Sequence, residues 1–193
     1  MASFRLHRAA DGRLLAVTVP GLLSEPERRR LLAAILAEER WFVEASTEGI
    51  RPHRRGAVLY TIVDEALWVV DRVARLAREH APRWDLSLPD HPRMEHQITA
   101  YRDGDHYLPH RDDEGSEASA RALTYVYHLH RVPRSYGGGE LILHHAGEET
   151  VIVPDNGAVV LFPSGLLHEV RPVTSESSAL AASRFSVNGW LWR

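Results

Sequence analysis

Residues 94–130 read MEHQITAYRDGDHYLPHRDDEGSEASARALTYVYHLH, a run of short β-prone segments separated by polar, glycine-containing turns. The pattern continues toward the end of the chain, where Gly137-Gly138-Gly139 and Asp155-Asn156-Gly157 separate further segments. The expected strands are 95–101, 106–112, 122–130, 140–144, 150–153, 158–162, 168–173 and 184–192. Many short strands at close spacing predict a sandwich or barrel of β-sheets.

The first half of the chain predicts helices that pack outside this β core. Ser24-Glu25-Pro26-Glu27 has the form of a capping box, and the helix it opens should run to about Arg40. A second helix is expected to start at Asp64 as N-cap and to end before Pro82, with strands at 41–43 and 57–62 between the two helices. We expect one mostly β domain with flanking helices over 1–193, in which 1–93 support a core formed by 94–193.

Two residue types are missing from the chain, and their absence restricts its chemistry. There is no cysteine, which excludes disulfides, thiolate metal sites and a cysteine nucleophile. There is no lysine either, since all 23 Lys+Arg residues are arginines. Lysine Schiff-base chemistry is therefore excluded, and an anionic ligand must be held by arginine, histidine, hydroxyl or backbone N–H groups.

Charge and hydropathy predict where the protein works. The net charge of -3 gives no general attraction for nucleic acid or an anionic membrane surface. No apolar run approaches the roughly 20 residues of a membrane helix. Residues 1–20 lack the apolar centre of a signal peptide. We therefore expect a cytoplasmic protein with neither a nucleic-acid nor a membrane partner.

His110 and Asp112 form a His-x-Asp step on an expected strand or strand end. Alternate residues of a strand point to the same face, so this imidazole and carboxylate can converge on one cation. His168 begins a later strand, and a jelly roll can bring such distant strands face to face. Two histidines and one carboxylate form the facial triad that binds iron(II) in non-haem oxygenases.

Arg184 opens the last β segment, RFSVNGW. An oxygenase that uses a 2-oxo acid needs a buried cation for the distal carboxylate, and arginine binds carboxylates through a planar pair of N–H donors. A surface arginine in a salt bridge is the alternative reading of this residue.

Taken together, the motifs from Tyr101 to Trp192 resemble the prolyl-hydroxylase branch of the 2-oxoglutarate/Fe(II) oxygenase superfamily. The matching segments are 101–105 (YRDGD), 108–112 (LPHRD), 121–124 (RALT), 138–141 (GGEL), 160–164 (VLFPS), 168–173 (HEVRPV) and 184–190 (RFSVNGW). Any one segment is weakly specific, whereas all seven in this order and spacing are highly specific. The N-terminal half resembles the family only in its pattern of helices and strands.

The resemblance implies a double-stranded β-helix (jelly-roll) core with the N-terminal helices packed on it. It implies Fe(II) held by His110, Asp112 and His168, 2-oxoglutarate as co-substrate at Arg184, molecular oxygen as oxidant and ascorbate as an accessory reductant. It adds further residues around the co-substrate, which are Tyr101, Thr124, Val126, Leu141 and Val170. The prime substrate is left open between a peptide, including a prolyl residue, and a small molecule.

Two departures from the family pattern affect the co-substrate site. Close relatives often carry a tyrosine that touches 2-oxoglutarate where this chain has His128, which either donates a hydrogen bond in its place or packs. The segment between His168 and Arg184 is longer than usual through 175–183, which leaves Arg171 as a competing cation. Arg171 lies an odd number of positions from His168, so on an ideal strand it faces away from the iron.

Two functions of other classes compete with the oxygenase. A cupin-like jelly-roll metalloenzyme would need the triad but not Arg184. A catalytically inactive binding module would keep the fold without turnover, although the intact triad argues against it. Decarboxylation of 2-oxoglutarate distinguishes the oxygenase from both.

A polar loop, 44–56, precedes the second helix and carries Arg51, Arg54 and Arg55. The simplest interpretation is a solvated charged loop. The functional interpretation is a lid, with Gly49 and Gly56 as hinges, that recognises an anionic group on the prime substrate. Trp190 is expected in the core or at the rim of the substrate pocket.

Overall fold

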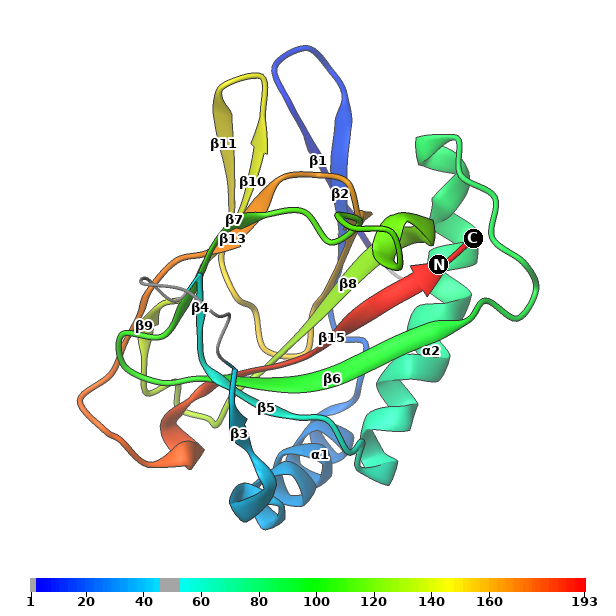
Figure 1. Ribbon diagram of the computed structural model, residues 1–193. Helices are drawn as coiled ribbons and strands as arrows, with labels where there is room; N and C mark the ends of the chain where they lie inside the picture. The colour runs from blue at the N-terminus through cyan, green and yellow to red at the C-terminus, as the bar shows by residue number, and fades with distance from the viewer. Residues whose placement is uncertain (1–2, 46–52) are drawn as a thin grey trace.

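Two antiparallel sheets face each other in the computed structural model, which describes residues 3–45 and 53–193 (Figure 1). The large sheet has eight strands, in the order β1 (Arg5–Arg8), β2 (Leu14–Val19), β12 (Val159–Pro163), β8 (Arg121–Leu129), β15 (Arg184–Trp192), β6 (Met94–Tyr101), β5 (Ala57–Leu59) and β3 (Val43–Glu44). The small sheet has five, in the order β11 (Glu148–Ile152), β10 (Leu141–His145), β13 (His168–Val170), β7 (His106–His110) and β4 (Arg54–Arg55). This architecture confirms the predicted jelly roll with flanking helices.

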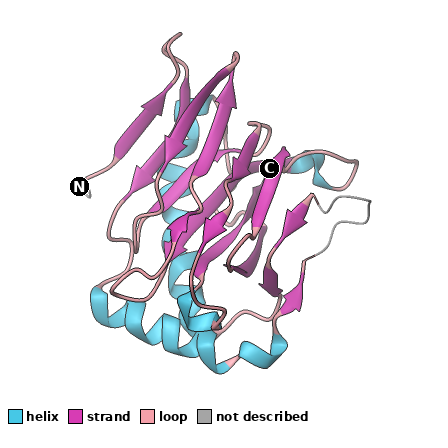
Figure 2. Ribbon diagram, turned by 90° about the vertical axis from the view of Figure 1, so that its left-hand side faces the viewer, coloured by secondary structure: helices cyan, strands magenta, loops and turns pink. Residues whose placement is uncertain are grey.

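Helices and turns complete the chain around the two sheets. The helices are α1 (Glu25–Ala37) and α2 (Asp64–His80), and Figure 2 shows them on the outside of the sheets. Among the described residues, four short 3-10 turns cover Glu39–Trp41, Ala81–Trp84, Ala118–Ala120 and Leu180–Ala182. A small ribbon pairs β9 (Gly137–Gly138) with β14 (Val173–Thr174). Within the described part of the chain, no helix combines the length and apolarity that crossing a membrane requires.

Strand β8 shows how the large sheet separates two environments. Its odd-numbered residues, from Leu123 to Leu129, belong to the apolar core under α1 and α2. Its even-numbered residues Thr124 and Val126 face the other way and line a cavity between the sheets. Because a strand alternates faces at every residue, one face stabilises the fold by apolar burial and the other is free to carry chemistry.

The helices differ in detail from the sequence prediction. The capping box at Ser24 is present, but α1 ends at Ala37 and a 3-10 turn replaces its expected last turn. Val63, not Asp64, occupies the N-cap position of α2, and it makes no side-chain cap. Asp64 instead lies in the first turn, where its charge favours the positive end of the helix dipole.

Short strands account for most of what the sequence prediction missed. The hairpin of β1 and β2 extends the large sheet beyond β12 and was not predicted. The expected strand at 41–43 is wrong at Trp41, which lies in a 3-10 turn with its side chain exposed. Its pairing with β5 begins only at Val43.

Candidate metal centre

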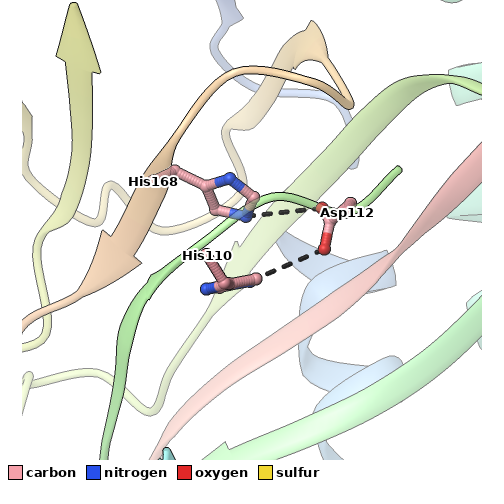
Figure 3. A group of neighbouring side chains, drawn as sticks. All are labelled: His110, Asp112 and His168. Carbon is pink, nitrogen blue, oxygen red and sulfur yellow. Dashed lines mark ion pairs between the residues drawn. The ribbon is translucent and has the colours of Figure 1, made fainter. Parts of the chain in front are cut away.

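His110, Asp112 and His168 come together between the two sheets. Strands β7 and β13 are antiparallel neighbours in which His110 lies opposite His168, and Asp112 follows β7 by two residues. His110 Nε2 lies 3.5 Å from Asp112 Oδ1, and His168 Nε2 lies 3.3 Å from Asp112 Oδ2. Figure 3 shows the three side chains pointing toward one another. One ligand atom from each lies within 4.8 Å of the other two, so the three can hold one metal ion.

Backbone carbonyl groups decide which nitrogen of each histidine faces the metal position. His110 Nδ1 lies 2.8 Å from the carbonyl oxygen of Leu108, and His168 Nδ1 lies 2.8 Å from that of Leu166. A carbonyl oxygen only accepts, so each Nδ1 carries the proton and donates it. Each Nε2 is then left as a lone-pair ligand, which is the arrangement found around metal-binding histidines.

Asp112 is held by its own set of contacts. Its backbone N–H donates to the carbonyl oxygen of Ser164 at 2.9 Å, and its Oδ2 accepts a hydrogen bond of 2.7 Å from Thr124 Oγ1. Burial by itself raises the pKa of Asp112, but attraction to His168 and contacts with both histidines outweigh it and hold that pKa well below its usual range. The residue is therefore an ionised carboxylate at neutral pH, as a metal ligand must be.

The triad opens onto a cavity of about 280 Å³ between the sheets. The predicted residues Tyr101, Leu141, Val170 and Trp190 line this cavity together with Thr124.

Arg184 reaches the same cavity from the first position of β15. Its side chain is 1% exposed and its guanidinium lies 5.1 Å from the ring centroid of Tyr101. Burial lowers the pKa of Arg184, yet an arginine stays charged under all ordinary conditions. Its Nε and Nη1 have no hydrogen-bond partner within residues 3–45 and 53–193. A buried, charged group with unused donors fits an anionic ligand such as a carboxylate.

Arg171 occupies a different environment from Arg184. Its side chain is 42% exposed and its Nη2 lies 2.6 Å from Glu149 Oε2, outside the cavity. The neighbouring His144, Glu149 and Glu169 form a second group with ligand atoms within 4.8 Å of one another. This group lies at the edge of the small sheet, where Arg171 already neutralises Glu149. The triad is therefore the more deeply buried of the two groups, and it shares a cavity with the buried cation Arg184.

His128 is buried beside Arg184 and does not line the cavity. Arg184 Nη2 lies 3.5 Å from His128 Nδ1. Burial, followed by the charge of Arg184, lowers the pKa of His128 well below its usual value, so the ring is neutral at pH 7. A neutral Nδ1 can accept from the guanidinium, which places His128 as a support for the arginine.

The three arginines of the expected lid lie in three different situations. Arg51 falls outside the described residues. Arg54 lines the cavity, with its guanidinium 5.1 Å from the ring centroid of Tyr107. Arg55 is not among the residues that line the cavity, and its Nε lies 3.8 Å from Asp105 Oδ1.

Several cavity residues were not predicted from the sequence. Gln97, Ser186 and Asn188 line the wall formed by β6 and β15, and Arg121 lies at the same cavity. Alternation along β15 was the signal that could have found two of them, because 184, 186, 188 and 190 share one face.

This combination of a jelly roll, a His-x-Asp…His site and a buried arginine defines a non-haem iron dioxygenase that uses a 2-oxo acid. The sequence model of the 2OG-Fe(II) oxygenase superfamily matches residues 96–192, and the chain belongs to that superfamily. It is an Fe(II)- and 2-oxoglutarate-dependent dioxygenase. Membership confirms the resemblance found in the sequence.

Individual relatives agree with this assignment. An uncharacterized PKHD-type hydroxylase of Synechocystis sp. is 29% identical over 96% of this chain and 67% of its own length. Among solved structures, a Pseudomonas putida prolyl-4-hydroxylase superposes with a TM-score of 0.70 at 23% identity, covering 92% of each chain. A Trichoplax adhaerens prolyl hydroxylase, in complex with a hypoxia inducible factor peptide fragment, gives 0.71 at 18% identity and covers 92% of this chain and 83% of its own. The structural matches show the shared fold.

Proposed function

We propose that the protein hydroxylates an unactivated C–H bond of an amino-acid residue or a small molecule, with iron(II) held by His110, Asp112 and His168. Arg184 binds the distal carboxylate of 2-oxoglutarate. The observation that carries the proposal is the cavity of about 280 Å³ that the triad and Arg184 share. The metal ion and 2-oxoglutarate can therefore bind next to each other in one cavity.

The bound iron and 2-oxoglutarate supply oxygen activation, with succinate and carbon dioxide as co-products. The chain supplies position and electrostatics. Leu108 and Leu166 fix the two histidine rings through their carbonyl oxygens, and Thr124 fixes the carboxylate. The apolar side chains Leu141 and Val170 limit water around the reacting centre.

Two other cavity residues, Arg54 and Asn188, present hydrogen-bond donors to the prime substrate. Arg54 Nη2 donates to Thr99 Oγ1 at 3.0 Å, so the hydroxyl proton of Thr99 is directed to Asn188 Oδ1 at 2.9 Å. Ser186 Oγ also donates to Asn188 Oδ1, at 3.1 Å. Both acceptor positions of the Asn188 oxygen are thus used, so an acceptor on a ligand would bind Asn188 through its amide N–H groups.

Asn188 of the large sheet and Arg54 of the small sheet together make this part of the cavity suitable for an acceptor with negative charge. We infer that the prime substrate carries a carboxylate or a similar anionic group near the C–H bond that reacts. A peptide with an acidic side chain and a free amino acid both satisfy this requirement. The Trichoplax relative, which binds a peptide fragment, supports the peptide option.

The test is a mass-spectrometric search of cell extract, and of a peptide fraction prepared from it, for compounds that gain one oxygen atom. The enzyme is supplied with iron(II), 2-oxoglutarate and ascorbate. Formation of the product should stop when either iron or 2-oxoglutarate is omitted, and succinate should form in equal amount. A product that forms equally well without 2-oxoglutarate would contradict the proposal.

A further inference from the structure

Tyr136 lies in the connection between β8 and β9 and turns its ring into the protein. Its side chain is 8% exposed, and it packs with Tyr101, Val170 and Val173. Tyr101 and Val170 line the cavity of the metal centre, so Tyr136 belongs to the layer directly behind that wall. The aromatic ring alone would account for this packing, but the residue also carries a hydroxyl group.

That hydroxyl is buried and has no hydrogen-bond partner within the described residues. Leaving a buried polar group unpaired costs about 1–3 kcal/mol, and folded proteins keep few such groups. Phenylalanine would fill the same space without this cost. The hydroxyl of Tyr136 is therefore free to donate to an acceptor outside the described residues, such as a bound ligand.

Two arginines lie near Tyr136. The guanidinium of Arg134 lies over its ring, 4.2 Å from the centroid, and Arg184 is the buried arginine, which has the same unmet requirement. Burial raises the pKa of Tyr136 by more than the charges of Arg184 and Arg134 lower it, so the hydroxyl remains a proton donor at neutral pH. Arg184 Nε and Nη1 are also unpaired among the described residues. One bound carboxylate offers about four acceptor positions, enough for all of these donors.

The surrounding chain holds Arg184 in position for that purpose. A Cβ on Gly139 would lie only 2.6 Å from Arg184 Cδ, and the φ of Gly139 is +70°. Glycine is thus required both for the backbone conformation and for the passage of the arginine stem. His128 Nδ1 accepts a hydrogen bond from Arg184 Nη2 at 3.5 Å. The Nε and Nη1 donors of Arg184 therefore remain available to another partner.

We propose that the Tyr136 hydroxyl donates a hydrogen bond to the distal carboxylate of 2-oxoglutarate bound at Arg184. This inference rests on the proposed function and adds a co-substrate-binding residue to it. Tyr136 then acts with Arg184 on one carboxylate, while His128 is a positioning residue that contacts the arginine.

The test measures binding to the iron-loaded protein without oxygen, by calorimetry, for Tyr136→Phe and wild type. Two ligands are compared: 2-oxoglutarate, and 2-oxopentanoate, in which a methyl group replaces the distal carboxylate. The variant should raise the Kd of 2-oxoglutarate by about tenfold or more, as expected for a hydrogen bond to a charged group. The affinity for 2-oxopentanoate, measured directly or by competition, should not change.

Thermal stability provides a second readout that does not depend on turnover. Removing an unpaired buried hydroxyl should leave the Tm of the ligand-free protein unchanged or higher, while the rise in Tm on adding 2-oxoglutarate becomes smaller. Tyr125→Phe is the matched control, because it removes another unpaired buried hydroxyl, on the helix-covered face of β8. The control should change neither the Kd nor the ligand-induced rise in Tm.

Each result decides for or against the assignment. An unchanged Kd for 2-oxoglutarate in Tyr136→Phe overturns it, as does an equal loss of affinity for both ligands, which would indicate a packing role. Arg184→Leu separates this failure from that of the proposed function. If Arg184→Leu weakens 2-oxoglutarate binding and Tyr136→Phe does not, only the role of Tyr136 is wrong. If neither variant weakens it, the co-substrate site itself lies elsewhere.

Discussion

Replacing Thr124 by valine should weaken iron binding without removing a metal ligand. Thr124 Oγ1 donates to Asp112 Oδ2 at 2.7 Å, and the two residues are 3% and 8% exposed, so water screens this bond little. A hydrogen bond to a charged group contributes about 1.5–3 kcal/mol. Because 1.4 kcal/mol corresponds to about tenfold in affinity, the iron Kd should rise by about 10- to 100-fold, the range typical of residues that orient metal ligands.

The assay is an anaerobic calorimetric titration of Thr124→Val with iron(II). Valine matches the shape of threonine, so the packing between the sheets is largely kept. Thr99→Val is the control, because Thr99 hydrogen-bonds to Asn188 in the same cavity and touches no member of the triad. If folded Thr124→Val binds iron as tightly as wild type, or if Thr99→Val weakens binding equally, the Thr124 hydrogen bond does not support the metal ligand Asp112.

Three further changes test other parts of the account. Arg184→Leu should raise the KM for 2-oxoglutarate well over tenfold, whereas Arg171→Leu, measured in the same assay, should not. Arg54→Ser should raise the KM for the prime substrate, most strongly at low salt, and should leave substrate-free decarboxylation of 2-oxoglutarate unchanged. The control Arg55→Ser, on the same strand, should leave both the KM and the decarboxylation unchanged. Hydrogen bonding to Arg72 is the main cause that lowers the pKa of Glu27 from 4.5 to about 2, so its stabilisation is present above pH 4.5 and is lost as the pH falls toward 2. Between those pH values, wild type should lose about 1 kcal/mol more stability than Glu27→Gln, a modest amount because the pair is partly exposed, as followed by thermal unfolding at each pH.

The parts of the fold that were predictable are those with a strong local signal. The capping box at Ser24 and the alternation along β8 and β15 led to real elements at nearly the right residues. The hairpin of β1 and β2 was missed because its apolar run, LLAVTV in β2, resembles any buried segment, and its pairing with β12 is made only in three dimensions. Strands of two residues, such as β4, carry no periodicity at all.

The metal centre was also only partly predictable. Sequence spacing indicated its candidate ligands, whereas the contacts between them depend on the folded structure. The His-x-Asp step indicated two candidate ligands on one strand, but the pairing of His168 with His110 depends on the register of β13 and β7. The carbonyl groups that orient the rings and the unpaired hydroxyl of Tyr136 leave no pattern in the sequence. Such roles depend on burial and direction, which only the assembled sheets define.

The most direct test of the central claim is the formation of succinate from 2-oxoglutarate by iron-loaded wild type and by His168→Ala. We predict iron-dependent succinate formation in wild type and none in the variant, because two remaining ligands hold the metal too weakly and no longer place it in the cavity with Arg184. Near-normal succinate formation by His168→Ala would contradict the assignment of the triad and with it the proposed function of the site.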